Sequence, residues 1–173
     1  MVYVISGGPG FGKSVLIDGL RKLGYPVGGE IARAIIQQEL ETGGRLLPWK
    51  DSSGFEKLVI HERIRFFESI GEEEIAFSDR GLPDQAAFSV YKKKALSKQL
   101  KEALARNQYA KKVFLTPPWR QIYRNDLIRT ETFEQAVLIH ECIVNTYLEF
   151  GYEPINLPKV SPELRTAFIL EAL

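Results

Sequence analysis

Short apolar runs alternate with longer amphipathic segments along the 173 residues of this chain. The short runs are rich in valine, isoleucine and aromatic residues, which is typical of strands buried in a parallel sheet. Glycine, proline or aspartate follows most of the runs and marks where each one ends. From this pattern we predict five strands, at residues 2–5, 25–28, 75–78, 113–115 and 154–157.

The longer segments carry apolar residues three and four positions apart, which is the spacing of one face of a helix. Gly24, which follows the first of these segments, is a typical helix stop. Strands that alternate with helices predict an α/β fold, in which a five-stranded parallel sheet has helices on both faces. The predicted helices cover residues 15–23, 30–40, 55–70, 84–91, 96–107, 133–150 and 162–173.

Composition limits the range of functions. A chain of this length is expected to form a single domain, 1–173, and it contains no internal repeat or linker. The 23 basic and 22 acidic residues give a net charge of +1, which provides no general attraction to nucleic acid or membranes. The single cysteine, Cys142, cannot form a disulfide within the chain, and neither a signal peptide nor a membrane span is evident. We expect a soluble cytoplasmic protein, and a homodimer is left open.

The strongest chemical signal is a glycine-rich segment between the first strand and the first helix. It fits the pattern Gly-x4-Gly-Lys-Ser of a phosphate-binding loop (P-loop) and predicts a three-layer P-loop NTPase fold. Glycines let the backbone curl so that its N–H groups point at phosphate oxygens, and the helix start adds its positive dipole end. Lys13 is expected to reach the β- and γ-phosphates of ATP, and the Ser14 hydroxyl to bind Mg²⁺. The predicted nucleotide-binding residues are Gly8, Pro9, Gly10, Phe11, Gly12, Lys13, Ser14 and Val15.

Charged residues follow the next two strands, at the edge of the sheet where ligands of such folds bind. Glu30 is a candidate general base for an acceptor hydroxyl, and the alternative is a carboxylate favoured by the helix dipole. Asp79 is a candidate Mg²⁺ ligand through water, or else a helix or turn cap. Arg80 is a catalytic candidate that would hold the acceptor or Glu30, or else it forms a surface ion pair.

A charged segment follows the fourth strand, and residues 118–132 are a candidate lid. The guanidinium groups of Arg120, Arg124 and Arg129 suit the charge of a γ-phosphate, and closure would exclude water. If the segment is helical, Arg120 and Arg124 share a face. We take Arg124 and Arg129 as catalytic candidates, with a solvated charged helix as the alternative.

Four segments taken together resemble the small bacterial ATP-binding family described as "AAA domain" or "predicted ATPase" proteins. This family is similar to nicotinamide-riboside kinase and, more distantly, to nucleoside and nucleotide kinases. The resemblance covers nearly the whole chain and implies a nucleotide-kinase-like fold, with Glu30 as base and Asp79–Arg80 as an acidic–arginine pair. It also implies that Arg124 and Arg129 are lid arginines. The segments are 7–14, Glu30-x-x-Arg33, Asp-Arg-Gly-Leu-Pro-Asp at 79–84 and Arg-x-Asp-x-x-Arg-x-Glu at 124–131.

The leading hypothesis is a small-molecule kinase that transfers the γ-phosphoryl group of Mg-ATP to a nucleoside-like or other small hydroxyl or phosphate acceptor. The alternative is a regulatory ATPase that acts on a protein partner. A GTPase is disfavoured because the sequence has no Asn/Thr-Lys-x-Asp guanine motif. A polynucleotide kinase is disfavoured because the chain is nearly neutral and has no stripe of basic and aromatic residues.

Overall fold

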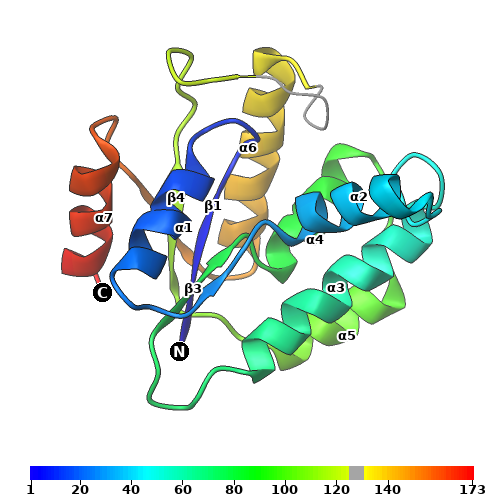
Figure 1. The fold of residues 1–173 in the computed structure, drawn as a ribbon, viewed down its shortest axis with the longest axis horizontal. Coiled ribbons are helices and arrows are strands. Elements are labelled where there is room, and N and C mark those ends of the chain that lie inside the picture. The colour runs from blue at the N-terminus through cyan, green and yellow to red at the C-terminus, as the bar shows by residue number, and fades with distance from the viewer. Residues whose placement is uncertain (125–130) are drawn as a thin grey trace.

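Five parallel strands form the centre of the computed structural model, which describes residues 1–124 and 131–173. The strand order is β2-β3-β1-β4-β5, so the first strand lies in the middle of the sheet (Figure 1). The predicted α/β fold with a parallel five-stranded sheet is therefore confirmed. Within the described residues, no helix is both long enough and apolar enough to pass through a bilayer. The strands are β1 (Val2–Gly7), β2 (Val27–Gly28), β3 (Ala76–Asp79), β4 (Lys112–Thr116) and β5 (Glu153–Asn156).

The helices begin and end within a few residues of the predicted positions. The third helix begins earlier than predicted because the Asp51 carboxylate caps it, accepting a hydrogen bond from the Gly54 N–H at 2.8 Å. The fifth helix begins later, after Ser97, whose hydroxyl caps its first turn. The helices are α1 (Lys13–Lys22), α2 (Ile31–Thr42), α3 (Ser52–Glu68), α4 (Leu82–Tyr91), α5 (Lys98–Arg106), α6 (Phe133–Glu149) and α7 (Pro162–Glu171).

The sheet separates two apolar cores, because successive side chains of a strand point to opposite faces. Val2 and Val4 of β1 pack with residues of α3, α4, α5 and α6. Tyr3 and Ile5, which alternate with them, pack with residues of α1 and α7. All six residues of β1 are buried, so the P-loop that follows it starts from the most enclosed part of the fold.

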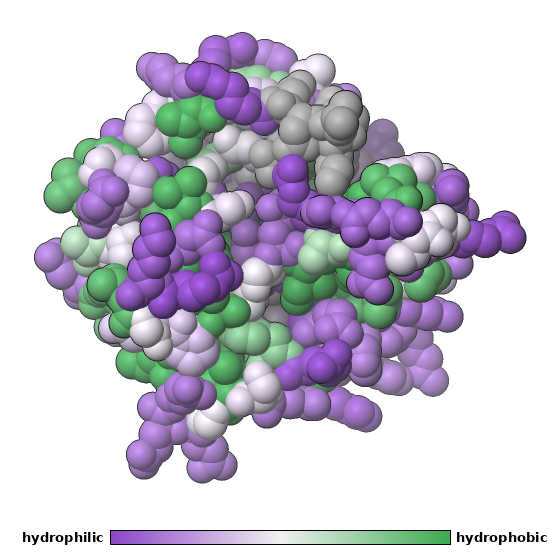
Figure 2. All heavy atoms as spheres, viewed as in Figure 1, coloured by the Kyte–Doolittle hydropathy of each residue, from purple (hydrophilic) through white to green (hydrophobic). Residues whose placement is uncertain are grey.

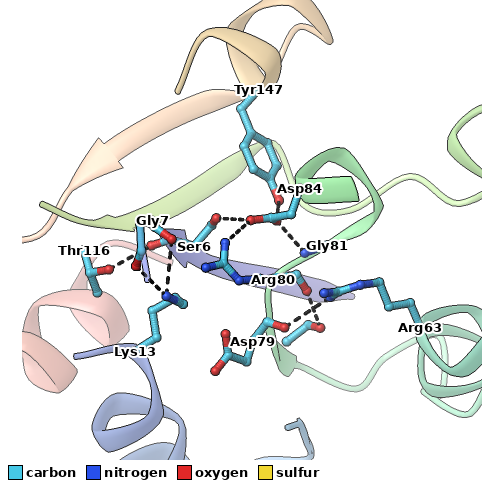
Figure 3. Close-up of polar contacts among 12 residues, drawn as sticks. Ser6, Gly7, Lys13, Arg63, Asp79, Arg80, Gly81, Asp84, Thr116 and Tyr147 are labelled. Carbon is cyan, nitrogen blue, oxygen red and sulfur yellow. Dashed lines mark hydrogen bonds and ion pairs between the residues drawn. The ribbon is translucent and has the colours of Figure 1, made fainter. Parts of the chain in front are cut away.

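A buried carboxylate connects the central strand with two helices. Asp84, in the first turn of α4, accepts hydrogen bonds from the Ser6 hydroxyl of β1 and from the Tyr147 hydroxyl of α6, the latter at 2.6 Å. The backbone N–H of Gly81 donates a third bond to it at 2.8 Å. Figure 3 shows these groups converging on the one carboxylate. Asp84 therefore fixes β1, α4 and α6 relative to one another.

The charge of Asp84 is balanced by Arg80, whose Nη1 lies 2.9 Å from Oδ1. Burial alone would raise the pKa of Asp84. The positive charges of Arg80 and Arg63 and the hydrogen bonds to the carboxylate outweigh burial, so the pKa is lowered overall. Asp84 is thus ionised in the folded protein, and its contribution to stability depends on that charge.

Substitution of Asp84 by asparagine is expected to reduce the free energy of unfolding by about 3–5 kcal/mol, because Arg80 would remain buried without its carboxylate. Since the folded pKa of Asp84 is depressed, its contribution is present above the unfolded pKa of about 4 and is lost as the pH falls through the folded value. Urea unfolding over a pH series measures both effects. The matched control is Glu102→Gln, in the exposed pair with Lys98, for which the expected loss is under about 1 kcal/mol. Equal losses in the two variants would contradict the role given to Asp84.

Candidate active site

The P-loop connects β1 with α1 in a curled conformation that needs glycine at defined positions. Gly12, the residue before α1, has a φ of 83° in the left-handed region. Gly7 has a φ of +129°, and a Cβ there would lie 2.5 Å from the Thr116 carbonyl oxygen. A side chain at either position would strain the backbone. The loop is therefore held between β4 and the start of α1.

Lys13 lies across this loop with its ammonium group directed inward. Its Nζ donates hydrogen bonds to the carbonyl oxygens of Gly8 at 2.9 Å and Gly7 at 3.2 Å (Figure 3). The residue is only 5% exposed. A buried ammonium group at the mouth of a loop of this shape suits an anionic group, as predicted from the sequence.

One of the predicted nucleotide-binding residues, Phe11, has its side chain packed into the interior. Phe11 is buried, and its ring packs against the rings of Tyr123, Phe133 and His140. Phe11 thereby anchors the loop to α6, and only its backbone is available to a phosphate. Val15 is half exposed at the start of α1 and lines the cavity beside the loop.

Asp79 is the last residue of β3 and pairs in register with Ile5 of the central strand. It is 1% exposed, and within the described residues its Oδ1 has no hydrogen-bond partner. Burial raises the pKa of Asp79, although the positive charges of Lys13, Arg80 and Arg63 oppose that rise. A buried carboxylate oxygen without a partner is suited to a cation or to a water bound to one.

The donors near Asp79 fit Mg²⁺ that arrives with phosphates. Mg²⁺ is usually held by one or two protein oxygens together with phosphates and water. Ser14 and Asp79 provide such oxygens at the carboxyl edge of the sheet. Among the described residues, no three histidine, cysteine or acidic side chains form a cluster that would hold a metal ion by itself. The two predicted metal ligands are therefore compatible with Mg²⁺ bound through a nucleotide.

Arg80 is buried, whereas the sequence left open that it forms an ion pair on the surface. It has a positive φ of 68°, a conformation that non-glycine residues seldom adopt, which directs the side chain away from the strand. Its guanidinium group is buried, pairs with Asp84 and lies 5.1 Å from the ring centre of Phe88. The surface-pair alternative is thus wrong. It arose because the sequence pattern did not show that α4 and α6 cover the turn after β3.

Glu30 lies between two cavities. The first, about 180 Å³, is the P-loop cavity, and the second, about 120 Å³, is bounded by Asp79 and Arg80 and is here called the inner cavity. The Ser14 hydroxyl donates to Glu30 Oε2 at 3.4 Å, and the side chain makes no capping hydrogen bond to α2 within the described residues. In Figure 2, hydrophilic residues gather where α1 and α2 face each other. This position is compatible with the general-base hypothesis and, because Glu30 directly precedes α2, also with a carboxylate favoured by the helix dipole.

The candidate lid is described in part. Residues 120–122 form a turn and not a helix, so the condition under which Arg120 and Arg124 would share a helical face is not met in the described part of this segment. Two prolines directly after β4 explain the turn. Arg120 pairs with Glu134 of α6. Arg124 lines the P-loop cavity, whereas Arg129 lies outside the described residues.

Sequence reasoning missed Arg63. This residue lies on α3 and is 2% exposed, its Nη1 donates to the Asp79 carbonyl oxygen at 3.2 Å, and its Nε has no partner among the described residues. The signal was available, because Arg63 follows Val59 and Ile60 at helical spacing and so occupies an apolar position. An arginine at a buried helical position should have been taken as a candidate site residue.

A third cavity, here called the outer cavity, was also missed. It has a volume of about 300 Å³ and shares Ala32, Ile36 and Phe88 with the inner cavity. Its residues come from four separate segments of the chain, which the sequence pattern alone does not bring together. Its aromatic lining consists of Trp49, Phe55, Phe88 and Tyr91.

Comparisons with known proteins agree with this architecture. A family model described as an AAA domain matches residues 2–165. No curated protein matches the chain. A deoxyadenosine kinase from M. mycoides with bound dATP has a similar fold, with a TM-score of 0.64, 11% identity and coverage of 99% of this chain and 98% of that one. A thymidylate kinase from Candida albicans has a TM-score of 0.67 and 12% identity, with coverage of 99% of this chain and 89% of that one. A shikimate kinase from Acinetobacter baumannii has a TM-score of 0.57 and 14% identity, with coverage of 99% of this chain and 91% of that one. At these identities the likeness shows the fold.

The buried charge of Asp79 leads to a prediction about stability. Because the folded pKa of Asp79 is raised, its burial lowers stability as the pH rises above the unfolded pKa of about 4. We expect Asp79→Asn to increase the free energy of unfolding of the nucleotide-free protein by about 1–3 kcal/mol at neutral pH, and by less near pH 4. Urea unfolding at the two pH values measures the difference. Asp18→Asn, on the exposed face of α1, is the control, and a loss of stability in the Asp79 variant alone would contradict this account.

Proposed function

The chain belongs to the AAA domain family, and from this premise we propose that it is a small-molecule kinase that uses Mg-ATP. One observation carries the proposal, namely that Glu30 lines both the P-loop cavity and the inner cavity. A carboxylate at that junction has a phosphoryl donor on one side and an acceptor on the other. This is where the general base of a phosphotransferase must act.

The transfer would proceed in a single displacement. The acceptor oxygen forms a bond to the γ-phosphorus while the bond from that phosphorus to the β–γ bridging oxygen breaks, and ADP leaves. The proton of the acceptor hydroxyl passes to the Glu30 carboxylate. Lys13 offsets charge on the β- and γ-phosphate oxygens, and Ser14 and Asp79 are the residues that would hold Mg²⁺, which neutralises the phosphate chain when bound.

The inner and outer cavities support an acceptor with a hydroxyl at one end and a planar ring at the other. Arg63 and Arg80 line the inner cavity near Glu30 and would hold polar groups of the acceptor. The outer cavity offers aromatic faces, including that of Phe88, for stacking of a ring. Nucleosides have this chemistry, and two proteins of similar fold are a deoxyadenosine kinase and a thymidylate kinase. A regulatory ATPase would also need a group that orients water, but it would not need the aromatic lining of an acceptor cavity.

A screen of acceptors tests the reaction. Nucleosides, nucleotides and vitamin-like alcohols are incubated with Mg-ATP, and ADP and phosphorylated product are measured. We expect one acceptor class with a planar ring to raise ADP release, and Glu30→Gln to lower that transfer by ~10²–10⁴-fold while ATP still binds. The control is Glu41→Gln, an exposed carboxylate of the same helix. Steady hydrolysis that no acceptor stimulates would instead favour the regulatory ATPase.

The phosphate-binding role is tested separately. Lys13→Ala is expected to reduce turnover, or the affinity for ATP, by ~10²-fold or more, because a preorganised charge next to the transferred group is lost. Lys22→Ala, at the exposed end of α1, is the matched control. Isothermal titration calorimetry and ADP release give the two quantities. Turnover and affinity that are unchanged in the Lys13 variant would remove the basis for the P-loop assignment.

A further inference from the structure

Tyr123 directly follows the turn after β4, and its ring lies against the P-loop. A Cβ built on Gly10 would lie 2.5 Å from Cδ2 and 2.7 Å from Cε2 of this ring. Gly10 has a φ of +79°, in the left-handed region, and it has no side chain to hold the ring away. The ring therefore packs directly on the backbone of the loop, whose N–H groups are expected to bind phosphate.

Two aromatic side chains hold the Tyr123 ring in this place. Its ring centre lies 5.4 Å from that of Phe133 and 6.3 Å from that of Phe11, and both pairs are arranged edge to face. This arrangement is favourable for aromatic pairs at such distances. Phe11 belongs to the loop and Phe133 is the first residue of α6, so the half-buried Tyr123 contacts both elements.

The hydroxyl group of Tyr123 contacts a different part of the site. It donates a hydrogen bond to the backbone carbonyl oxygen of Glu131, two residues before α6. Glu131 lines both the inner cavity and the outer cavity. A phenylalanine could make the same ring contacts, so the packing of the ring does not account for the hydroxyl. Tyr123 thus joins the P-loop to the wall of both cavities.

A second connection between the loop and α6 does not involve this hydroxyl. The ring centres of Phe11 and Phe133 lie 5.8 Å apart, and a Cβ built on Gly8 would lie 2.5 Å from the Ala136 carbonyl oxygen. These contacts hold α6 against the loop whether or not residue 123 carries a hydroxyl. Removal of the hydroxyl alone therefore isolates the connection to Glu131.

We propose that Tyr123 is a positioning residue that couples phosphate binding at the P-loop to the placement of Glu131 at the inner and outer cavities. The inference rests on the proposed function, because it requires a nucleoside triphosphate in the P-loop. Phosphates fix the loop backbone at Gly10, and the Tyr123 ring on that backbone is fixed with it. The hydroxyl then holds Glu131 in place. The cavity wall thus loses freedom when the donor binds, before the acceptor enters.

Amide hydrogen exchange with and without saturating Mg-ATP tests the coupling. In the unaltered protein we expect Mg-ATP to slow exchange both at residues 8–14 and at residues 131–135. Tyr123→Phe keeps the ring and removes the hydroxyl, so the slowing at 8–14 should persist. The slowing at 131–135 should decrease by ~3- to 10-fold, which is the effect of one lost hydrogen bond. A purely structural role would instead change exchange at 131–135 equally with and without Mg-ATP.

A matched pair of variants separates the ring from the hydroxyl. Isothermal titration calorimetry with Mg-ATP is expected to give Tyr123→Phe an affinity within about 2-fold of the unaltered protein, because the ring contacts remain. Tyr123→Ala should bind ~3- to 10-fold more weakly, since the support of Gly10 is lost. The control is Tyr25→Phe, whose ring packs on Phe77 of the sheet and which should behave as the unaltered protein in both measurements. Unchanged affinity in the alanine variant would contradict the support that the ring gives to the loop.

The outcomes distinguish this inference from the proposed function. Exchange in the buried strand β1 reports folding in every variant, so a misfolded alanine variant is recognised and the phenylalanine variant still decides the coupling. If Mg-ATP slows exchange at neither segment of the unaltered protein, the proposed function and this inference both fall. If Mg-ATP slows exchange at 8–14 alone, or if Tyr123→Phe retains the full slowing at 131–135, only the inference falls.

Discussion

The arrangement of the site depends on one buried carboxylate, that of Asp84. Through it the central strand, α4 and α6 are joined at the point where Arg80 leaves β3. Arg80 adopts its unusual backbone conformation there, and the neighbouring Asp79 is held at the edge of the sheet. An unfavourable backbone conformation persists only where the surrounding structure holds it firmly in place. The hydrogen bonds of Asp84 hold Arg80 in this way.

Several charged side chains lie close together at the site, although the net charge of the whole chain is only +1. The total of +1 does not say where the charges lie, and Lys13, Arg63 and Arg80 act electrostatically on one carboxylate, that of Asp79, from three separate parts of the fold. Opposite charges at close range in a buried setting interact strongly and are weakly screened by salt. Under the proposed function, these charges would face a ligand that brings both negative phosphates and a divalent cation.

Sequence reasoning predicted most of the fold and part of the site. Strand and helix order followed from periodicity, since buried strands and amphipathic helices have distinct patterns. Lys13 was predicted from the P-loop pattern, and Glu30 and Asp79 because parallel strands bring their carboxyl ends to one edge. The structure places these three residues around neighbouring cavities. The apolar spacing of Arg63 was visible in the sequence, but that its helix reaches the site depends on tertiary packing, which the sequence pattern does not show. The buried setting of Arg80 was not predicted for the same reason. The turn at 120–122 follows two prolines, which the sequence indicated only as the end of the fourth strand.

The position of Glu30 has a consequence for the design of ligands. Because one carboxylate borders both the P-loop cavity and the inner cavity, the two cavities are neighbours rather than separate sites. Under the proposed function, a single compound that joins a nucleoside to a planar ring through a chain of phosphates would occupy the P-loop cavity and the acceptor cavities at once. Binding the two halves together avoids the second loss of translational freedom, so such a bisubstrate compound would bind far more tightly than either half. The number of phosphates in the compound that binds most tightly would then indicate the distance between the bound donor and the bound acceptor.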